Sequence, residues 1–229
     1  MTTPRPAAVI VLAAGEGTRM KSATPKVLHT IGGRTLVEHA MAAARGSDPA
    51  YLAVVVRHGR DRVAAHCLEV DPEVLVCDQD EIPGTGRATE CGLAALPAEL
   101  AGTILVTYGD VPLLTGATLR DVLTAHETSS AAVTVVTSIV ADPAGYGRIV
   151  RGADGGVEAI VEDRDATAEQ RAIPEINSGI YAFDVQVLRS GLDRVGTHNA
   201  QGEKYLTDVV ALARGDGQAV CLLYTSDAA

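Results

Sequence analysis

The chain has 229 residues, of which 47% are hydrophobic and only 3% aromatic, and its formal net charge is −10. This hydrophobic content is typical of a globular chain, and the length suffices for one large α/β domain. The negative charge repels nucleic acids and anionic membranes, and the scarcity of aromatic rings disfavours base stacking. No nucleic acid and no membrane is therefore expected as a partner.

The cysteines and histidines show no spacing typical of metal ligands. We expect the four cysteines to be reduced thiols, which fits a cytoplasmic protein. The first apolar run, Ala7–Ala14, is too short to span a bilayer, and no signal-peptide cleavage pattern follows it. The pair Arg57-His58 follows a predicted strand and is expected on the surface.

Strand and helix patterns alternate over the first part of the chain. The apolar run Ala7–Ala14 predicts a buried strand, and the capping box Thr35-x-x-Glu38 opens a helix that ends near Gly46. In chain order we further expect a strand at 52–56, a helix at 61–68, a strand at 74–77, a helix at 85–96, a strand at 103–107, a helix at 118–128 and a strand at 131–140. This alternation predicts an α/β fold with a mostly parallel sheet and helices on both faces.

The pattern changes after Pro143. A hairpin is expected at 149–151 and 157–162 around Asp154-Gly155-Gly156, then a strand at 176–183 and a helix near 185–193. No long linker separates this part from the first, so we expect it to extend the same sheet. Residues 221–229 carry no capping signal and are expected to form an anomalous tail, truncated or foreign, that does not return to the sheet.

A glycine-rich, cationic loop follows the first strand. Glycines there let backbone N–H groups approach a phosphate or a base, and from Gly15 to Lys26 the loop holds three cations and one anion. This favours triphosphate binding, although an ordinary βα turn would look similar. Met20 stands where the dinucleotide fingerprint needs a small residue and the P-loop needs glycine, and Pro25 opposes the helix of a P-loop. A P-loop ATPase is therefore disfavoured.

A series of motifs, all in the same order, resembles a known family. L-A-A-G-E-G-T-R-M at 12–20 and P-K-V-L-H at 25–29 resemble the sugar-1-phosphate nucleotidyltransferases, and among these the bacterial N-acetylglucosamine-1-phosphate uridyltransferases. The resemblance covers residues 8–220 and continues through Gln79 with Gly84-Thr85, Y-G-D-V-P-L at 108–113, G-Y-G-R-I at 145–149, I-V-E at 160–162, E-I-N-S-G-I-Y at 175–181, and N-A-Q-G-E with Y-L-T-D at 199–208.

The resemblance implies a Rossmann-like nucleotidyltransferase domain over residues 1–220. Its nucleotide-binding part would span about 1–142 and its sugar-binding part about 143–220. The implied reaction transfers a uridylyl group from UTP to N-acetylglucosamine-1-phosphate with Mg²⁺ and without a general base, giving UDP-N-acetylglucosamine and pyrophosphate. Two alternatives stay open, another sugar-1-phosphate nucleotidyltransferase and a sugar-nucleotide-binding module with little activity.

The family's functional residues map onto this chain by motif. Arg19 and Lys26 match the catalytic phosphate-binding cations, and Asp110 matches a magnesium ligand. The nucleotide would be bound by Leu12, Ala14, Gly15, Gln79, Gly84 and Thr85. The sugar would be bound by Tyr108, Gly147, Glu162 and Asn177.

The chain departs from the family's pattern at a few places. Arg87 stands where the family usually has histidine, and Asp163 follows Glu162 where it often has glutamine. The family's second magnesium ligand, an asparagine, and its C-terminal acetyltransferase β-helix are absent from the sequence. We therefore expect UTP binding with poor turnover. The oligomeric state stays open, because the family assembles through that C-terminal half.

Overall fold

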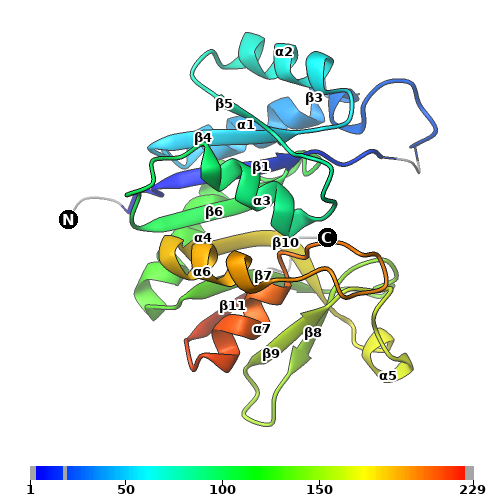
Figure 1. Ribbon diagram of the computed structural model, residues 1–229, viewed down its shortest axis with the longest axis vertical. Coiled ribbons are helices and arrows are strands. Elements are labelled where there is room, and N and C mark those ends of the chain that lie inside the picture. The colour runs from blue at the N-terminus through cyan, green and yellow to red at the C-terminus, as the bar shows by residue number, and fades with distance from the viewer. Residues whose placement is uncertain (1–3, 18–19, 225–229) are drawn as a thin grey trace.

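The computed structural model describes residues 4–17 and 20–224 (Figure 1). Its strands are β1 (Ala8–Ala13), β2 (Thr30–Ile31), β3 (Arg34–Thr35), β4 (Tyr51–Val56), β5 (Leu75–Asp78), β6 (Thr103–Tyr108), β7 (Val133–Ile139), β8 (Arg148–Arg151), β9 (Val157–Val161), β10 (Glu175–Asp184) and β11 (Val220–Tyr224). Its helices are the 3₁₀ turn η2 (Lys26–Leu28) and the α-helices α1 (Leu36–Gly46), α2 (Arg60–Val70), α3 (Thr85–Ala94), α4 (Gly116–Ser129), α5 (Ala168–Arg171), α6 (Val185–Arg194) and α7 (Asp208–Gly215).

One mixed sheet runs through the centre of the molecule in the order β11-β7-β10-β6-β1-β4-β5, and the β8–β9 hairpin joins it through β10 (Figure 1). Along this order the neighbours are parallel, except that β10 runs antiparallel to both β6 and β7. The predicted α/β fold with a mostly parallel sheet is thereby confirmed. Because β10 lies between β6 and β7, the later part of the chain shares the sheet of the earlier part.

The sheet separates two hydrophobic cores. In β1, Ala8, Ile10 and Leu12 pack into the core under α3, α6 and α7, whereas Val9, Val11 and Ala13 pack into the core under α1, α2 and α4. Successive side chains of a strand point to opposite faces, so a strand covered on both faces is apolar throughout. Among the described residues, no helix combines the length and apolar character needed to cross a bilayer.

The elements expected over the first part of the chain are present, with ends shifted by a few residues. The helix expected from Thr118 begins at Gly116, because the Thr115 side chain caps it and accepts a hydrogen bond from the Thr118 backbone N–H. The β2–β3 hairpin, α5 and α7 were not predicted. They are short, and short elements give weak periodic signals in sequence.

The end of the chain corrects one expectation. Residues 220–224 form β11, which pairs in parallel with β7 from Val220 opposite Val133 to Tyr224 opposite Thr137. The apolar run V-C-L-L-Y is suited to a strand, and the otherwise unpaired edge of β7 supplies its hydrogen-bond partners. The expectation that the chain does not return to the sheet is therefore wrong for residues 221–224. Residues 225–229 lie outside the described part of the chain.

Candidate functional site

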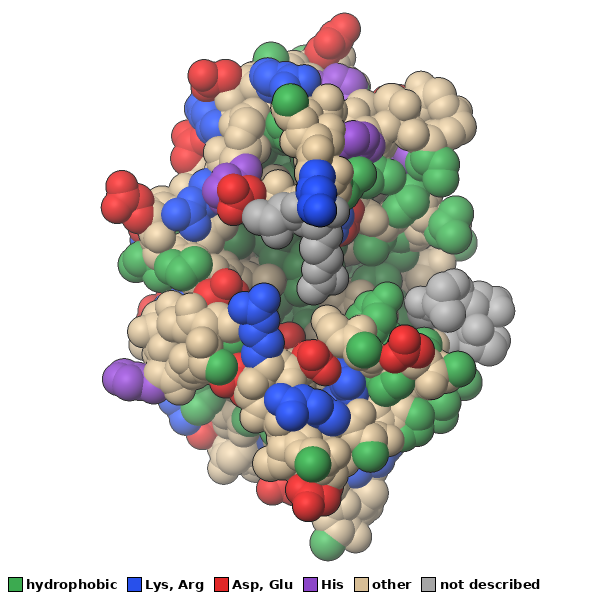
Figure 2. Space-filling model, turned by 90° about the vertical axis from the view of Figure 1, so that its right-hand side faces the viewer, with side chains coloured by type: hydrophobic (Ala, Val, Ile, Leu, Met, Phe, Trp, Pro, Cys, Tyr) green, Lys and Arg blue, Asp and Glu red, His purple; other side chains and the backbone are tan. Residues whose placement is uncertain are grey.

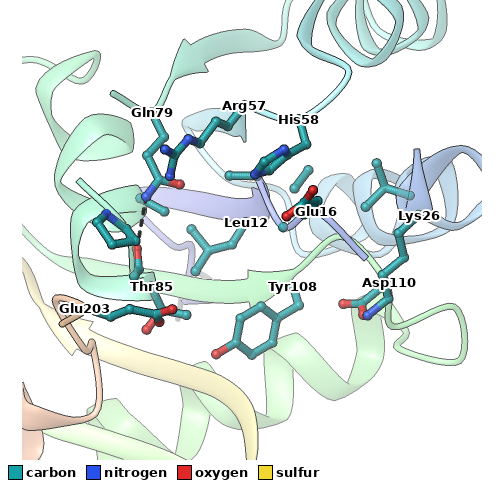
Figure 3. A pocket seen from close by; sticks show the side chains of 17 residues that line it. Leu12, Glu16, Lys26, Arg57, His58, Gln79, Thr85, Tyr108, Asp110 and Glu203 are labelled. Carbon is teal, nitrogen blue, oxygen red and sulfur yellow. Dashed lines mark hydrogen bonds and ion pairs between the residues drawn. The ribbon is translucent and has the colours of Figure 1, made fainter. Parts of the chain in front are cut away.

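A cavity of about 660 Å³ opens at the carboxyl ends of the central parallel strands (Figure 3). From β1 the chain proceeds to β4 and β5 on one side and then crosses to β6 on the other. Ligands of open α/β sheets bind at such a switch point, because the strand ends diverge there and leave a crevice. On this face Figure 2 shows a hollow between the two halves of the molecule, with Lys and Arg side chains at its rim.

Most of the predicted site residues meet at this cavity. The lining includes Leu12, Ala14, Gly15, Lys26, Gln79, Gly84, Thr85, Tyr108 and Asp110. Gly147, Glu162 and Asn177 are not among the residues that line it. Arg19, predicted to bind phosphates, lies outside the described residues. The described residues between β1 and η2 form no α-helix of the kind that follows a P-loop.

Gln79 stands at one end of the cavity with its amide held in one orientation. Its Nε2 donates to the carbonyl oxygens of Ile82, at 2.8 Å, and Gly84, at 3.2 Å. Since both partners can only accept, the amide nitrogen must face them and Oε1 remains for a ligand. The turn is tight because Gly84, at φ +115°, lies against the backbone of Lys204, where a Cβ would come within 2.3 Å of a carbonyl oxygen. The 79–84 turn thus presents a fixed hydrogen-bond acceptor.

Lys26 and Asp110 form an ion pair at the other end of the cavity (Figure 3). Lys26 opens η2, and Asp110 follows β6 in a turn where the Gly109 N–H donates to the Leu12 carbonyl at 2.8 Å. Both side chains are partly exposed, so a ligand can reach them. Within the described part of the chain, no three potential metal-ligating side chains gather in one place.

A single carboxylate nevertheless fits a magnesium ion that is shared with a substrate. Mg²⁺ commonly keeps several waters and takes only one or two protein carboxylates, completing its shell with substrate phosphates. Asp110 offers such a carboxylate beside a cation that would also face the phosphates. The residues present therefore fit the metal that the sequence led us to expect.

Tyr108 links the cavity to the sugar-side residues. Its hydroxyl lies near the side chains of Thr85 and Tyr181, and burial, with the nearby charges of Glu162 and Asp110, raises its pKa. Tyr181 in turn accepts a 2.6 Å hydrogen bond from Nδ2 of Asn177. The phenol is therefore neutral at physiological pH and acts as a hydrogen-bonding and packing group.

Glycine at position 179 makes room for the Tyr108 ring. Gly179 has φ +80°, and a Cβ there would lie 2.0 Å from Cε2 of Tyr108. Its N–H donates to Oδ1 of Asn177 at 3.0 Å, which holds the β10 bulge in place. The N-S-G segment of β10 thus positions two predicted sugar contacts at once.

Gly147, Glu162 and Asn177 lie together, although the hairpin and β10 bring them from distant parts of the sequence. The Gly147 carbonyl accepts from the Asn177 N–H at 2.9 Å, and a Cβ on Gly147 would lie 3.6 Å from Oε2 of Glu162. The fully buried Arg148 donates to Asp163 at 3.0 Å and so ties the ends of β8 and β9 together. The unusual acid at position 163 is therefore paired.

The Glu162 carboxylate lies among polar and acidic side chains. Burial raises its pKa, and the carboxylates of Asp208, Asp165 and Glu203 add to the increase, while a 3.1 Å hydrogen bond from Thr207 opposes it. A half-buried carboxylate with few donors around it is suited to accept hydrogen bonds from the hydroxyl groups of a ligand.

Several lining residues were missed in the sequence. Glu16, Arg57, His58 and Glu203 all border the cavity. Arg57 and His58 are half-buried there, which corrects the expectation that they lie on the open surface. Their position directly after β4 was the available signal, since residues following parallel strands lie at the binding edge. Glu203 gave no such signal, because an irregular segment brings it to the cavity.

Comparison with known proteins identifies the family. Residues 9–170 match the MobA-like NTP transferase domain. The chain belongs to this family. It is 60% identical over 224 residues to the bifunctional protein GlmU of Pseudarthrobacter chlorophenolicus, an alignment that covers 97% of this chain and 46% of that protein. It is 53% identical over 223 residues to the bifunctional protein GlmU of Thermobifida fusca, with 96% and 46% covered.

The NTP transferase fold is also seen in a solved structure. The chain resembles the crystal structure of UDP-glucose pyrophosphorylase complexed with UDP-glucose, with a TM-score of 0.73, 18% identity, and coverage of 95% of this chain and 90% of that one. The chain spans about half the length of the curated relatives it matches. It is a nucleotidyltransferase, and its cavity lies at the strand edge where this fold binds ligands.

Proposed function

We propose that the chain transfers a uridylyl group from UTP to N-acetylglucosamine-1-phosphate, releasing pyrophosphate and forming UDP-N-acetylglucosamine, with Mg²⁺ as cofactor. One observation carries the proposal. A single cavity holds the fixed acceptor of Gln79 at one end and the Lys26–Asp110 pair at the other. The high identity to proteins named GlmU, whose family the sequence motifs also resemble, supports the choice of substrates.

The nucleobase belongs at the Gln79 end. Uracil carries an N–H between two carbonyls, and the free Oε1 of Gln79 accepts from that N–H. The backbone at Leu12, Ala14, Gly15 and Gly84 comes close enough to the cavity to contact the base and ribose. The triphosphate then runs toward Lys26 and the loop that contains Arg19.

The chemistry needs charge neutralisation more than proton transfer. The sugar phosphate is already an anion at neutral pH, so it attacks the α-phosphorus of UTP without a general base while pyrophosphate leaves on the opposite side. Lys26 opposes the repulsion between the two anions and stabilises the charge of the transition state. When bound at Asp110, Mg²⁺ supplies further neutralisation of the phosphate oxygens. Glu162, Asn177 and the backbone of Gly147 orient the sugar.

The test is pyrophosphate release from UTP, N-acetylglucosamine-1-phosphate and magnesium, with Asp110→Asn as control. Release that depends on both substrates and falls at least roughly 100-fold in the variant is expected, because the carboxylate that holds the metal is lost. A screen of other sugar phosphates separates this reaction from that of another sugar-1-phosphate nucleotidyltransferase. Binding of UDP-N-acetylglucosamine with no pyrophosphate release from any pair would indicate a binding module instead.

A further inference from the structure

Arg57 is a cation at the nucleobase end of the cavity, and the proposed function so far gives it no role. It follows β4 directly, as Gln79 follows β5, and the pairing of Val56 with Asp78 brings these two strand ends side by side. The Gln79 N–H donates to the Val56 carbonyl at 2.9 Å. Both side chains line the cavity and come from the same edge of the sheet (Figure 3).

The Arg57 side chain is held at the turn that orients Gln79. Its Nη2 donates to the Glu81 carbonyl at 3.2 Å, while Nε2 of Gln79 is used by the carbonyls of Ile82 and Gly84. A guanidinium group has five N–H donors and no acceptor, so this one bond leaves donors for a ligand. The cavity wall therefore offers an acceptor, the Gln79 oxygen, next to a charged donor.

This pair of groups matches the edge of uracil and opposes that of cytosine. Uracil presents an N–H with a carbonyl on each side, so an acceptor beside a donor satisfies it. Cytosine keeps the 2-carbonyl of uracil, but its ring nitrogen is unprotonated and meets the Gln79 oxygen unfavourably. An amino group replaces the 4-carbonyl, and that amino group cannot accept from a guanidinium. A site built for one hydrogen-bonding edge rejects the analogue that leaves its polar groups unpaired.

We propose that Arg57 is a specificity-determining residue, which donates to the 4-carbonyl of uracil, next to the N–H bound by Gln79, and so makes the site choose UTP over CTP. This inference rests on the proposed function and deepens it. Arg57 acts on the base through this contact, rather than on the phosphates through its charge alone.

Calorimetric titration of the chain with UTP and with CTP, both with magnesium, tests the inference. Arg57→Ala should weaken UTP binding by roughly 10-fold, as expected for a charge-assisted hydrogen bond in a half-buried site, and leave CTP binding nearly unchanged. Arg60→Ala is the matched control. It removes the same charge nearby, but Arg60 pairs with Asp78 on the surface, outside the residues that line the cavity. Its UTP affinity should stay within about 2-fold of the wild type.

Thio-substituted nucleotides report on the carbonyl itself, because sulfur is a poor acceptor. Wild-type protein should bind 4-thio-UTP more weakly than UTP, and Arg57→Ala should remove that difference. Any effect of 2-thio-UTP should be the same in both proteins. If Arg57→Ala weakened UTP and CTP binding equally, Arg57 would act by simple attraction to the phosphates, and the inference would be overturned. A variant with unchanged affinity for both nucleotides would overturn it as well. If wild-type protein releases pyrophosphate and prefers UTP, either result leaves the proposed function standing. Absence of that activity and preference contradicts the proposed function itself.

Discussion

The Lys26–Asp110 ion pair brings two residues of opposite charge together at one end of the cavity. Each charge of the pair partly neutralises the other, and in the proposed reaction nucleotide and metal would give each a new partner. A phosphate can approach Lys26 as the metal approaches Asp110, so the pair can open at little electrostatic cost. On the proposed function, this is how a chain of net charge −10 would keep a site for a polyanion.

Substitution at this pair tests the site at the scale of one residue. Lys26→Ala should lower kcat/KM for pyrophosphate release by roughly 100-fold, because a charge that faces the developing anion is lost. The control is Lys21→Ala, which removes the same charge from the same loop at an exposed position outside the cavity lining. We expect the control to stay within about 2-fold of wild type. An equal loss in both variants would mean that only the overall charge of the loop matters.

At the scale of elements, β10 connects the two parts of the site. It pairs with β6, which ends in Tyr108, and its bulge carries both Asn177 and Gly179. The positive φ of Gly179 lets the backbone pass under the Tyr108 ring, so one strand positions the phenol and the predicted sugar contact together.

Alanine substitutions at two glycines with similar φ angles distinguish the cost of a steric clash from the cost of a positive φ. Gly179→Ala should destabilise the protein by roughly 2–4 kcal/mol, because the new methyl group meets Tyr108 in addition to the cost of a positive φ. Gly155→Ala, at φ +77° with no atom within 4 Å of the added Cβ, should cost only about 1 kcal/mol. Urea denaturation measures both. Equal losses would show that the Tyr108 ring moves aside freely.

At the scale of the whole molecule, acidic groups in the fold make stability depend on pH. Burial raises the pKa of Glu162, Glu203 and Asp208 in the folded protein. A carboxyl group with a raised pKa favours folding while it is protonated, and this contribution is lost as the pH rises through its folded-state pKa. At neutral pH the ionised carboxylates of the site therefore lower the stability of the folded protein.

Glu162→Gln removes one of these groups and makes the dependence measurable. The wild type should lose stability relative to this variant as the pH rises from about 4 to 7, because the unfolded chain ionises near 4.3 while the folded chain resists ionisation. Chemical denaturation at several pH values gives the difference. Glu158→Gln, at an exposed position on β9, the strand that precedes Glu162, should show no such trend. If the difference in unfolding free energy between wild type and Glu162→Gln did not change with pH, the raised pKa of Glu162 would be contradicted.

The sequence by itself determined the class of fold and most of the cavity lining. Long apolar runs predict buried strands because helices cover both faces of the sheet. Residues that follow parallel strands meet at one edge of the sheet, independently of how the helices pack. This logic indicated the binding edge at Gly15, and the resemblance of the motifs to a known family added Gln79 and Asp110 to the same site. It extends to Arg57 as well, but the motifs gave that residue no role.

The tertiary structure alone decided what depends on contacts between distant segments. The packing of Lys204 against Gly84, the Tyr108 ring beside Gly179, and the segment that brings Glu203 to the cavity arise from residues far apart in sequence. The pairing of β11 with β7 is of the same kind. Periodicity records which side of its own element a residue faces, and it carries no information about which other element arrives there.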